Sequence, residues 1–249
     1  ATGHNSIALG FSSNAASNSA IALGDQSKAL ATYATALGPL SIANGNNSAA
    51  LGLNSLASGA DSIALGPNAN ATGFAATALG KNVNSTGYGA TALGPYTTAN
   101  GSYSTAVGLS ATATALSSTA VGWHAGALGN YSTGLGAYAR ANGKNSTAVG
   151  HAAKAAGNNA IALGVAADAS SNYATALGVG AEASDIGAIA LGNQSKASGL
   201  EAVAIGDAAN AAGQDAIALG NRANAAGNSA TALGDGAKAA GNHAIALGV

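Results

Sequence analysis

The sequence predicts an all-β parallel solenoid made of short stacked coils, and three observations carry this prediction. Glycine recurs every 14 residues from Gly10 to Gly248, eighteen times without one insertion or deletion. An aliphatic residue precedes each of these glycines, and small residues return three and five positions after nearly all of them. A helical repeat needs roughly 20 residues or more per unit. We therefore interpret residues 1–249 as one array of coils and one domain.

The first element expected in each coil is a short strand that ends at the repeat glycine. Residues 62–66 show its pattern, in which small and larger side chains alternate. Ser62 and Ala64 share one face of this strand, whereas Ile63 and Leu65 share the other. The small face must meet the second strand, because only small side chains fit between two closely apposed strands. The aliphatic face therefore points out of the roll.

The second element is a strand that follows the repeat glycine, and a turn closes the coil. Small residues three and five positions after the glycine give this strand the same period of two. Glycine then returns at the seventh position in most coils, as at Gly45, Gly59, Gly143 and Gly241. We expect positive φ at this position, since a tight turn often requires it and glycine adopts it at low cost.

The outward aliphatic face predicts an oligomer. Repeated over all coils it exceeds the few hundred Å² of contiguous apolar surface that a soluble monomer usually exposes. Closed symmetry between copies is the usual way to cover such a face. Threonine replaces the branched aliphatic residue in six successive coils from Thr77 to Thr147, and there we expect ordered water or a small anion. The interface residues that we assign are Ile21, Leu23, Ile63, Leu65, Leu79, Leu93, Ile161, Leu163, Ile217 and Leu219.

Composition excludes several classes of function. The chain has 8 basic and 9 acidic residues and a net charge of −1, which argues against a nucleic-acid partner. It has no cysteine, so disulfides and thiolate chemistry are excluded. The four histidines never fall in adjacent coils, so we expect no metal site, and no motif indicates a cofactor. The sequence shows neither a signal peptide nor a long apolar run, and we expect it to be a fragment of a longer surface protein.

One charged column is the only candidate for catalysis. Asp168 and Glu182 are one coil apart, a separation of about 5 Å between neighbouring strands, which is also the spacing of the carboxyl groups in a retaining glycosidase. Lys154 and Lys196 occupy the coils on either side. We favour a solvated ladder of charges over an acidic active site, and we expect no enzymatic activity.

The repeat Asn-Ser-Ile-Ala-Leu-Gly-x-x-Ser-x-Ala-x-Gly, nearly intact at residues 61–73 and 145–157, resembles the head domain of the YadA-like trimeric autotransporter adhesins. The resemblance covers essentially the whole chain. It implies a left-handed parallel β-roll with 14-residue coils, three of which form a homotrimer through the aliphatic strand. It also implies a virulence-associated parent exposed on the bacterial surface and attached by a stalk and a C-terminal anchor in the outer membrane.

The function that this resemblance implies is attachment to host cells or to extracellular-matrix proteins such as collagen, fibronectin or laminin. Six of the ten aromatic residues lie in five consecutive coils, outside the alanine and aliphatic columns, where exposed rings are frequent binding anchors. The contact residues that we predict are Tyr96, Trp123, His124 and Tyr138. Two alternatives remain open at this point: an ice-binding solenoid, suggested by the threonine column, and a phage or toxin spike that acts on glycans.

Overall fold

The computed structural model describes residues 1–248 as short strands joined by turns, and it contains no helix in that range. These residues divide into two compact units, the first spanning Ala1–His124 and the second beginning at Ala125. Both units are built from the same 14-residue coil, with one three-residue strand and one two-residue strand per coil. The predicted class, a parallel β-solenoid with two short strands per coil, is confirmed. That the array is a single domain stays a prediction.

The strands of the first unit alternate between the two types. The three-residue strands are β1 (Ile7–Leu9), β3 (Ile21–Leu23), β5 (Thr35–Leu37), β7 (Ala49–Leu51), β9 (Ile63–Leu65), β11 (Thr77–Leu79), β13 (Thr91–Leu93), β15 (Thr105–Val107) and β17 (Thr119–Val121). The two-residue strands are β2 (Asn14–Ala15), β4 (Lys28–Ala29), β6 (Ile42–Ala43), β8 (Leu56–Ala57), β10 (Asn70–Ala71), β12 (Asn84–Ser85), β14 (Thr98–Ala99) and β16 (Thr112–Ala113).

The second unit continues the alternation. Its three-residue strands are β19 (Thr133–Leu135), β21 (Thr147–Val149), β23 (Ile161–Leu163), β25 (Thr175–Leu177), β27 (Ile189–Leu191), β29 (Val203–Ile205), β31 (Ile217–Leu219), β33 (Thr231–Leu233) and β35 (Ile245–Leu247). Its two-residue strands are β18 (Gly126–Ala127), β20 (Arg140–Ala141), β22 (Lys154–Ala155), β24 (Asp168–Ala169), β26 (Glu182–Ala183), β28 (Lys196–Ala197), β30 (Asn210–Ala211), β32 (Asn224–Ala225) and β34 (Lys238–Ala239).

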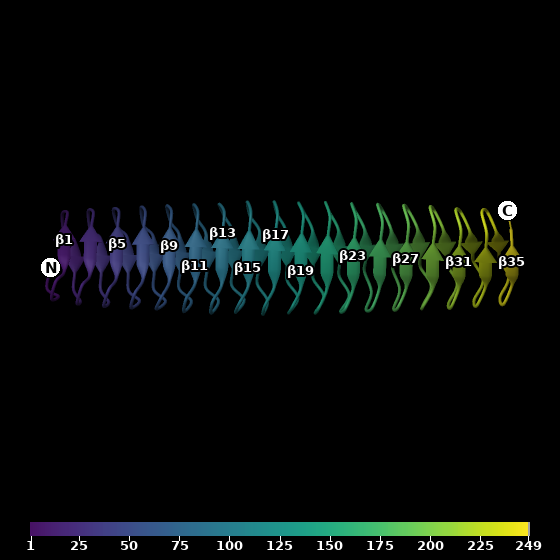
Figure 1. Cartoon of the computed structure of the whole chain (residues 1–249), viewed down its shortest axis with the longest axis horizontal. Coiled ribbons are helices and arrows are strands. Elements are labelled where there is room, and N and C mark those ends of the chain that lie inside the picture. The colour runs from purple at the N-terminus through teal and green to yellow at the C-terminus, as the bar shows by residue number, and fades with distance from the viewer. Residues whose placement is uncertain (249) are drawn as a thin grey trace. The chain divides into compact units, whose positions relative to one another are not determined.

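Within each unit, every strand pairs in parallel with the strand of the same type in the next coil (Figure 1). The register is constant, so that Ile63 faces Thr77 and Leu65 faces Leu79. Residues at equivalent positions therefore form columns that run across the coils. Because each residue of a strand meets its counterpart 14 positions later, one sequence rule determines both the hydrogen-bonded ladder and the side-chain columns.

The interior of each coil contains only small side chains, as the alternation predicts. Ser62 and Ala64 are fully buried, and the equivalent alanines and serines are buried as well except in the first and last coils. The largest fully buried side chains are Val83 and Thr97, which lie three residues after a repeat glycine. Since the two strands of a coil approach closely, alanine already fills the space between them at the density of a protein core.

The glycines at the seventh position do not have positive φ, so that expectation was wrong. A Cβ on Gly59 would lie 1.8 Å from the carbonyl oxygen of Gly73 in the next coil, whereas at Gly241 the nearest atom would be 3.8 Å away. Glycine at this position therefore permits the backbones of successive coils to approach closely, although coils with Ala31 or Ala115 there accept a side chain. Positive φ occurs instead at the repeat glycines and at two turn positions per coil, with non-glycine residues such as Asp61 (φ 59°) and Asn68 (φ 55°).

Candidate binding surfaces

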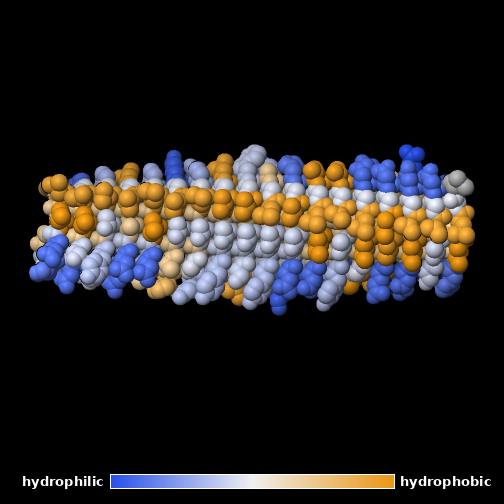
Figure 2. Space-filling view, in the orientation of Figure 1, coloured by the Kyte–Doolittle hydropathy of each residue, from blue (hydrophilic) through white to orange (hydrophobic). Residues whose placement is uncertain are grey.

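The aliphatic columns lie on the outer face of the three-residue strands. Figure 2 shows hydrophobic side chains gathered on this face of each unit, with paler residues beside them. Single-chain packing does not cover these side chains, because an interior filled by alanine leaves them no place inside the coil. Of the ten predicted interface residues, Ile21, Leu23, Leu79 and Leu163 are half-buried. The other six are 39–45% exposed: Ile63, Leu65, Leu93, Ile161, Ile217 and Leu219.

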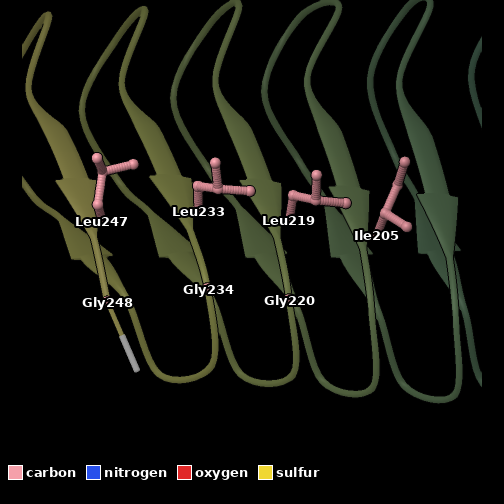
Figure 3. Close-up of a pocket in the computed structure, with 7 residues that line it drawn as sticks. All are labelled: Ile205, Leu219, Gly220, Leu233, Gly234, Leu247 and Gly248. Carbon is pink, nitrogen blue, oxygen red and sulfur yellow. The ribbon is translucent and has the colours of Figure 1, made fainter.

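In the second unit this face forms a shallow groove of about 630 Å³. The side chains of Ile205, Leu219 and Leu233 project from successive strands on the same side of the sheet (Figure 3). The exposed surface of the groove is mostly apolar, and the repeat glycines beside the leucines complete its lining. A groove of this composition can hold aliphatic side chains of another chain, but it offers no group that could do chemistry.

The four predicted contact residues lie in turns, three in the first unit and one in the second. Tyr96, Trp123 and His124 belong to the first unit, where the rings of Trp123 and His124 are 5.3 Å apart. Tyr138 belongs to the second unit, where its ring packs edge-on against His151 with a centroid distance of 6.1 Å. All four side chains are exposed. Their use in ligand binding stays a prediction.

A second aromatic cluster was missed by the sequence analysis. The rings of Phe74 and Tyr88 are stacked at 5.0 Å, and Tyr103 packs edge-on against Tyr88 at 5.3 Å. The three residues come from successive coils, at the turn that precedes each three-residue strand. In the sequence, the signal for this cluster was that the three aromatic residues stand eight or nine positions after repeat glycines of successive coils. In the structure, Gly89 leaves room for the Tyr103 ring, because a Cβ on Gly89 would lie 3.3 Å from that ring.

The charged column forms two ion pairs on the outer face of the two-residue strands. Lys154 Nζ lies 3.1 Å from Asp168 Oδ2, and Lys196 Nζ lies 3.1 Å from Glu182 Oε2. Asp168 and Glu182 pair in register on adjacent strands. Each carboxylate thus interacts with a lysine of a neighbouring coil, which is the arrangement of a charge ladder. The side chains are 35–49% exposed, so we expect each pair to contribute little to stability.

Asparagine side chains form ladders on the outer face of the first unit. Asn54 Nδ2 donates to Asn68 Oδ1 (3.0 Å), and Asn68 Nδ2 donates to Asn82 Oδ1 (2.9 Å). In a parallel ladder, Asn70 Nδ2 donates to Asn84 Oδ1 (2.9 Å). In every rung the amide nitrogen donates to the following coil, so the ladders have a direction.

Residues 1–248 contain no group of three or more histidine, aspartate or glutamate side chains that could hold a metal ion. Within the same range, no helix is long and apolar enough to cross a membrane.

Comparison with known families gives one finding that covers almost the whole chain. The model described as the YadA head domain repeat, which represents two copies of the repeat, matches nine segments: residues 1–27, 29–55, 57–82, 85–111, 113–139, 141–167, 169–195, 197–223 and 225–249. The matches begin every 28 residues, and two coils of 14 residues give the same spacing. A comparison with curated proteins gave no match.

Proposed function

Because the chain belongs to the family of YadA head domain repeats, we propose that it is the ligand-binding head of a homotrimeric bacterial surface adhesin. Membership implies an adhesive protein of the trimeric-autotransporter type that is exposed at the cell surface. The proposal adds three finer elements: a homotrimer of this chain, attachment of the parent protein to the outer membrane through a C-terminal anchor, and a host matrix protein as ligand.

The observation that carries the proposal is the aliphatic face that the coil does not bury. Ile63 and Leu65 are 44% and 45% exposed although their neighbours Ser62 and Ala64 are fully buried. Exposed aliphatic side chains at equivalent positions form a stripe in each unit, and contiguous stripes of this kind mark association surfaces. Three copies around one axis would cover the stripe on every copy with the same surface, as closed rotational symmetry requires.

The proposed ligands are extracellular-matrix proteins such as collagen, fibronectin or laminin. Each coil repeats the same turns at a fixed spacing, so a fibrous ligand can make many equivalent contacts, and three copies multiply them. The small net charge of −1 argues against electrostatic capture as the main contribution. Exposed rings such as Trp123 and amide side chains in the turns can then supply recognition.

A binding function also agrees with the chemistry of the surface. The only acidic pair suggested for catalysis, Asp168 and Glu182, is engaged by Lys154 and Lys196. The groove described on the aliphatic face contains no carboxylate. We propose that the head works by contact alone.

The test is binding of the purified trimer to immobilised collagen, fibronectin and laminin. The combined variant Tyr96→Ala, Trp123→Ala and Tyr138→Ala should fold and sediment like the wild type but bind its matrix ligand at least about tenfold more weakly, since buried aromatic anchors contribute most to interfaces. The matched control is Tyr33→Ala with Tyr173→Ala, because both tyrosines are exposed turn residues that are not among the predicted contacts. If the wild-type trimer binds none of the three proteins, the proposed ligand class is wrong.

A further inference from the structure

The aromatic stack of the first unit is open at one end. The Phe74 and Tyr88 rings are nearly parallel, with an interplanar angle of 14° and a centroid distance of 5.0 Å. Tyr88 belongs to the following coil, so the other face of the Phe74 ring is directed toward the preceding coil. The residue at the equivalent position there is Ala60, whose side chain is a single methyl group. The Phe74 side chain accordingly stays 44% exposed.

The small residue at Ala60 leaves a gap in a column of turn residues. The backbone N–H of Ala75 donates to Ala60 O at 2.8 Å. The same bond recurs one coil later, from Gly89 to Phe74 O, so the two turns have the same geometry. Asn46, one coil before Ala60, bounds the gap on its other side. Asn46 and Phe74 are two coils apart, about 10 Å, and a flat group with contacts of about 3.5 Å on each face fits between them.

A carboxylate lies beside this gap. Asp61 follows Ala60 in the turn, and its side chain is exposed. Asn47 Nδ2 donates to Asp61 Oδ1 at 3.0 Å, which orients the carboxylate at the edge of the coil. The ion pairs within residues 1–248 involve other acids, and no lysine or arginine stands eight or nine residues after a repeat glycine in the first unit. The gap therefore combines an open ring face with an unpaired negative charge.

We propose that this gap, bounded by Asn46, Ala60, Asp61 and Phe74, binds an arginine side chain of a protein partner. The guanidinium group stacks on the open face of Phe74, in the place where a larger side chain at residue 60 would lie, and it pairs with the Asp61 carboxylate. A cation within about 6 Å of a ring centroid is attracted by the face of the ring. That this arginine belongs to a matrix protein rests on the proposed function.

The geometry suits arginine better than lysine. A guanidinium group is planar, so it can lie flat on a ring while its edge donates two parallel hydrogen bonds to a carboxylate. The ammonium group of lysine is a compact, strongly hydrated charge without a flat face. A gap one coil wide between a ring and an amide therefore fits the shape of arginine as well as its charge.

The second unit carries an equivalent acid without the ring. Asp215 occupies the same turn position as Asp61, with a φ of 53° compared with 59°, and it is also exposed. In the coil after Asp215, the position equivalent to Phe74 holds Asn228. An exposed ion pair by itself contributes little to binding. We therefore expect no arginine site at Asp215.

The first variant, Asp61→Asn, removes the charge and keeps the shape of the side chain. Asparagine tolerates positive φ and already occupies this turn position at Asn47 and Asn159, so the fold accepts it. The matched control is Asp215→Asn, which makes the same change in the turn that has no ring beside it.

Two further variants alter the ring and the gap. Phe74→Leu removes the ring face but keeps an apolar side chain, and leucine occupies the equivalent position at Leu200. Ala60→Tyr fills the gap with a ring that continues the stack of Phe74 and Tyr88. Circular dichroism and sedimentation should be unchanged in both variants, because neither residue belongs to the interior of the coil.

The first measurement uses the two phenylalanines of the chain, Phe11 and Phe74. The full chain, labelled with ¹³C in its phenylalanine rings, is titrated with N-acetyl-arginine methylamide and followed by NMR. We expect the Phe74 signals to shift in the wild type and in Asp215→Asn, while the Phe11 signals stay in place. The Phe74 shift should disappear in Ala60→Tyr. In Asp61→Asn the dissociation constant should rise about fivefold, because the ion pair is lost.

Two results would overturn the proposal. One is the absence of a Phe74 shift in the wild type. The other is an equal dissociation constant for N-acetyl-lysine methylamide, or for the uncharged N-acetyl-citrulline methylamide, because the site would then not recognise the shape or the charge of the guanidinium group.

The second measurement compares binding of the same variants to immobilised collagen, fibronectin and laminin. A loss of about fivefold or more in Asp61→Asn and in Phe74→Leu, with Asp215→Asn unchanged, supports a matrix arginine as the occupant, because the loss is repeated in every copy. Equal binding by these variants and the wild type would contradict that assignment. If the arginine methylamide binds but no matrix protein does, the arginine site stands and the proposed function fails.

Discussion

The coil that carries Ile63 and the four coils after it share a buried alanine column and small interior side chains, but they differ in the outer face. Ala64, Ala78 and Ala92 are fully buried in the same column, and the strands pair in one unbroken register. Outside, Ile63 is followed by Thr77, Thr91, Thr105 and Thr119. The backbone does not respond to this change. The inner columns therefore determine the fold of the coil. The outer columns can vary without changing that fold, and they determine which surface the coil presents to other molecules.

The threonine coils place hydroxyl groups on the outer face, whereas the Ile63 coil places only aliphatic side chains there. Within residues 1–248 the hydroxyl groups of Thr77, Thr91, Thr105 and Thr119 form no hydrogen bond with another residue, and these side chains are half-buried. If three copies cover this face, each hydroxyl needs a new partner. A threonine-lined part of the interface should therefore be wetter than the part around Ile63 and Leu65.

The largest effect is expected from Leu65→Asp, which places a carboxylate in the aliphatic column of the Ile63 coil. Three copies of this variant would bring three carboxylates together, at a cost of several kcal/mol per ion in a dry interface. We expect the trimer to dissociate or fail to assemble in sedimentation velocity. Lys154→Ala, which changes an exposed ion pair, should assemble like the wild type. A wild-type chain that sediments as a stable folded monomer would contradict the assignment of this face.

A smaller effect, equal in both kinds of coil, is expected from alanine at the seventh-position glycines. A Cβ on Gly59 or Gly87 would lie 1.8 Å or 2.0 Å from the carbonyl oxygen of the next coil. The turn must then shift locally, and because Ala31 and Ala115 already occupy this position in other coils, we expect a loss of about 1–3 kcal/mol in the free energy of unfolding and no loss of the fold. Gly241→Ala, which meets nothing closer than 3.8 Å, is the control. Unequal losses at Gly59 and Gly87 in thermal unfolding would contradict the expectation that the turns respond equally in both kinds of coil.

The smallest effect, and one of opposite sign, is expected from Thr91→Ile. It converts a threonine coil to the pattern of the Ile63 coil and adds apolar surface to the proposed interface. We expect the trimer to gain about 1 kcal/mol per subunit and a higher Tm. A high-resolution structure of the wild-type trimer should show ordered water beside the Thr91 hydroxyl. A dry axis, with that hydroxyl bonded only to its own backbone, would refute the prediction of a wetter segment.

The fold could be predicted from the sequence because its determinants are local and repeated. The alternation of small and aliphatic residues in Ser62, Ile63, Ala64 and Leu65 shows which face of the strand is inside. Seventeen other coils carry the same pattern with small changes. The same alternation predicted that the aliphatic face is exposed in the single chain. The sequence did not predict the role of Gly59 correctly. That glycine permits a close approach to the backbone at Gly73, one coil away, and such a contact between coils cannot be recognised from the residue type.

The candidate sites were harder to predict because they depend on the order of residues within a column. The stack of Phe74, Tyr88 and Tyr103 joins two neighbouring turn positions, so no single column reveals it. The hydrogen bond between Asn70 and Asn84 depends on asparagine following asparagine in one column, which leucine occupies in the coil before. Neither feature follows from the composition or the 14-residue period. Both can be recognised only when the coils are aligned and the residues of neighbouring coils are compared.

The constant register has a consequence for how such a protein changes over generations. Within each unit, the strands of a coil bond only to the coil before and the coil after, through the same pairs of positions. Duplication or loss of one complete coil by recombination would leave every remaining bond intact, whereas a gain or loss of any other length would shift alanine out of the interior. Natural length variants of this array should therefore differ by whole coils. Each gain or loss of a coil would change the spacing between two surface sites on either side of it, while the structure of both sites stays the same.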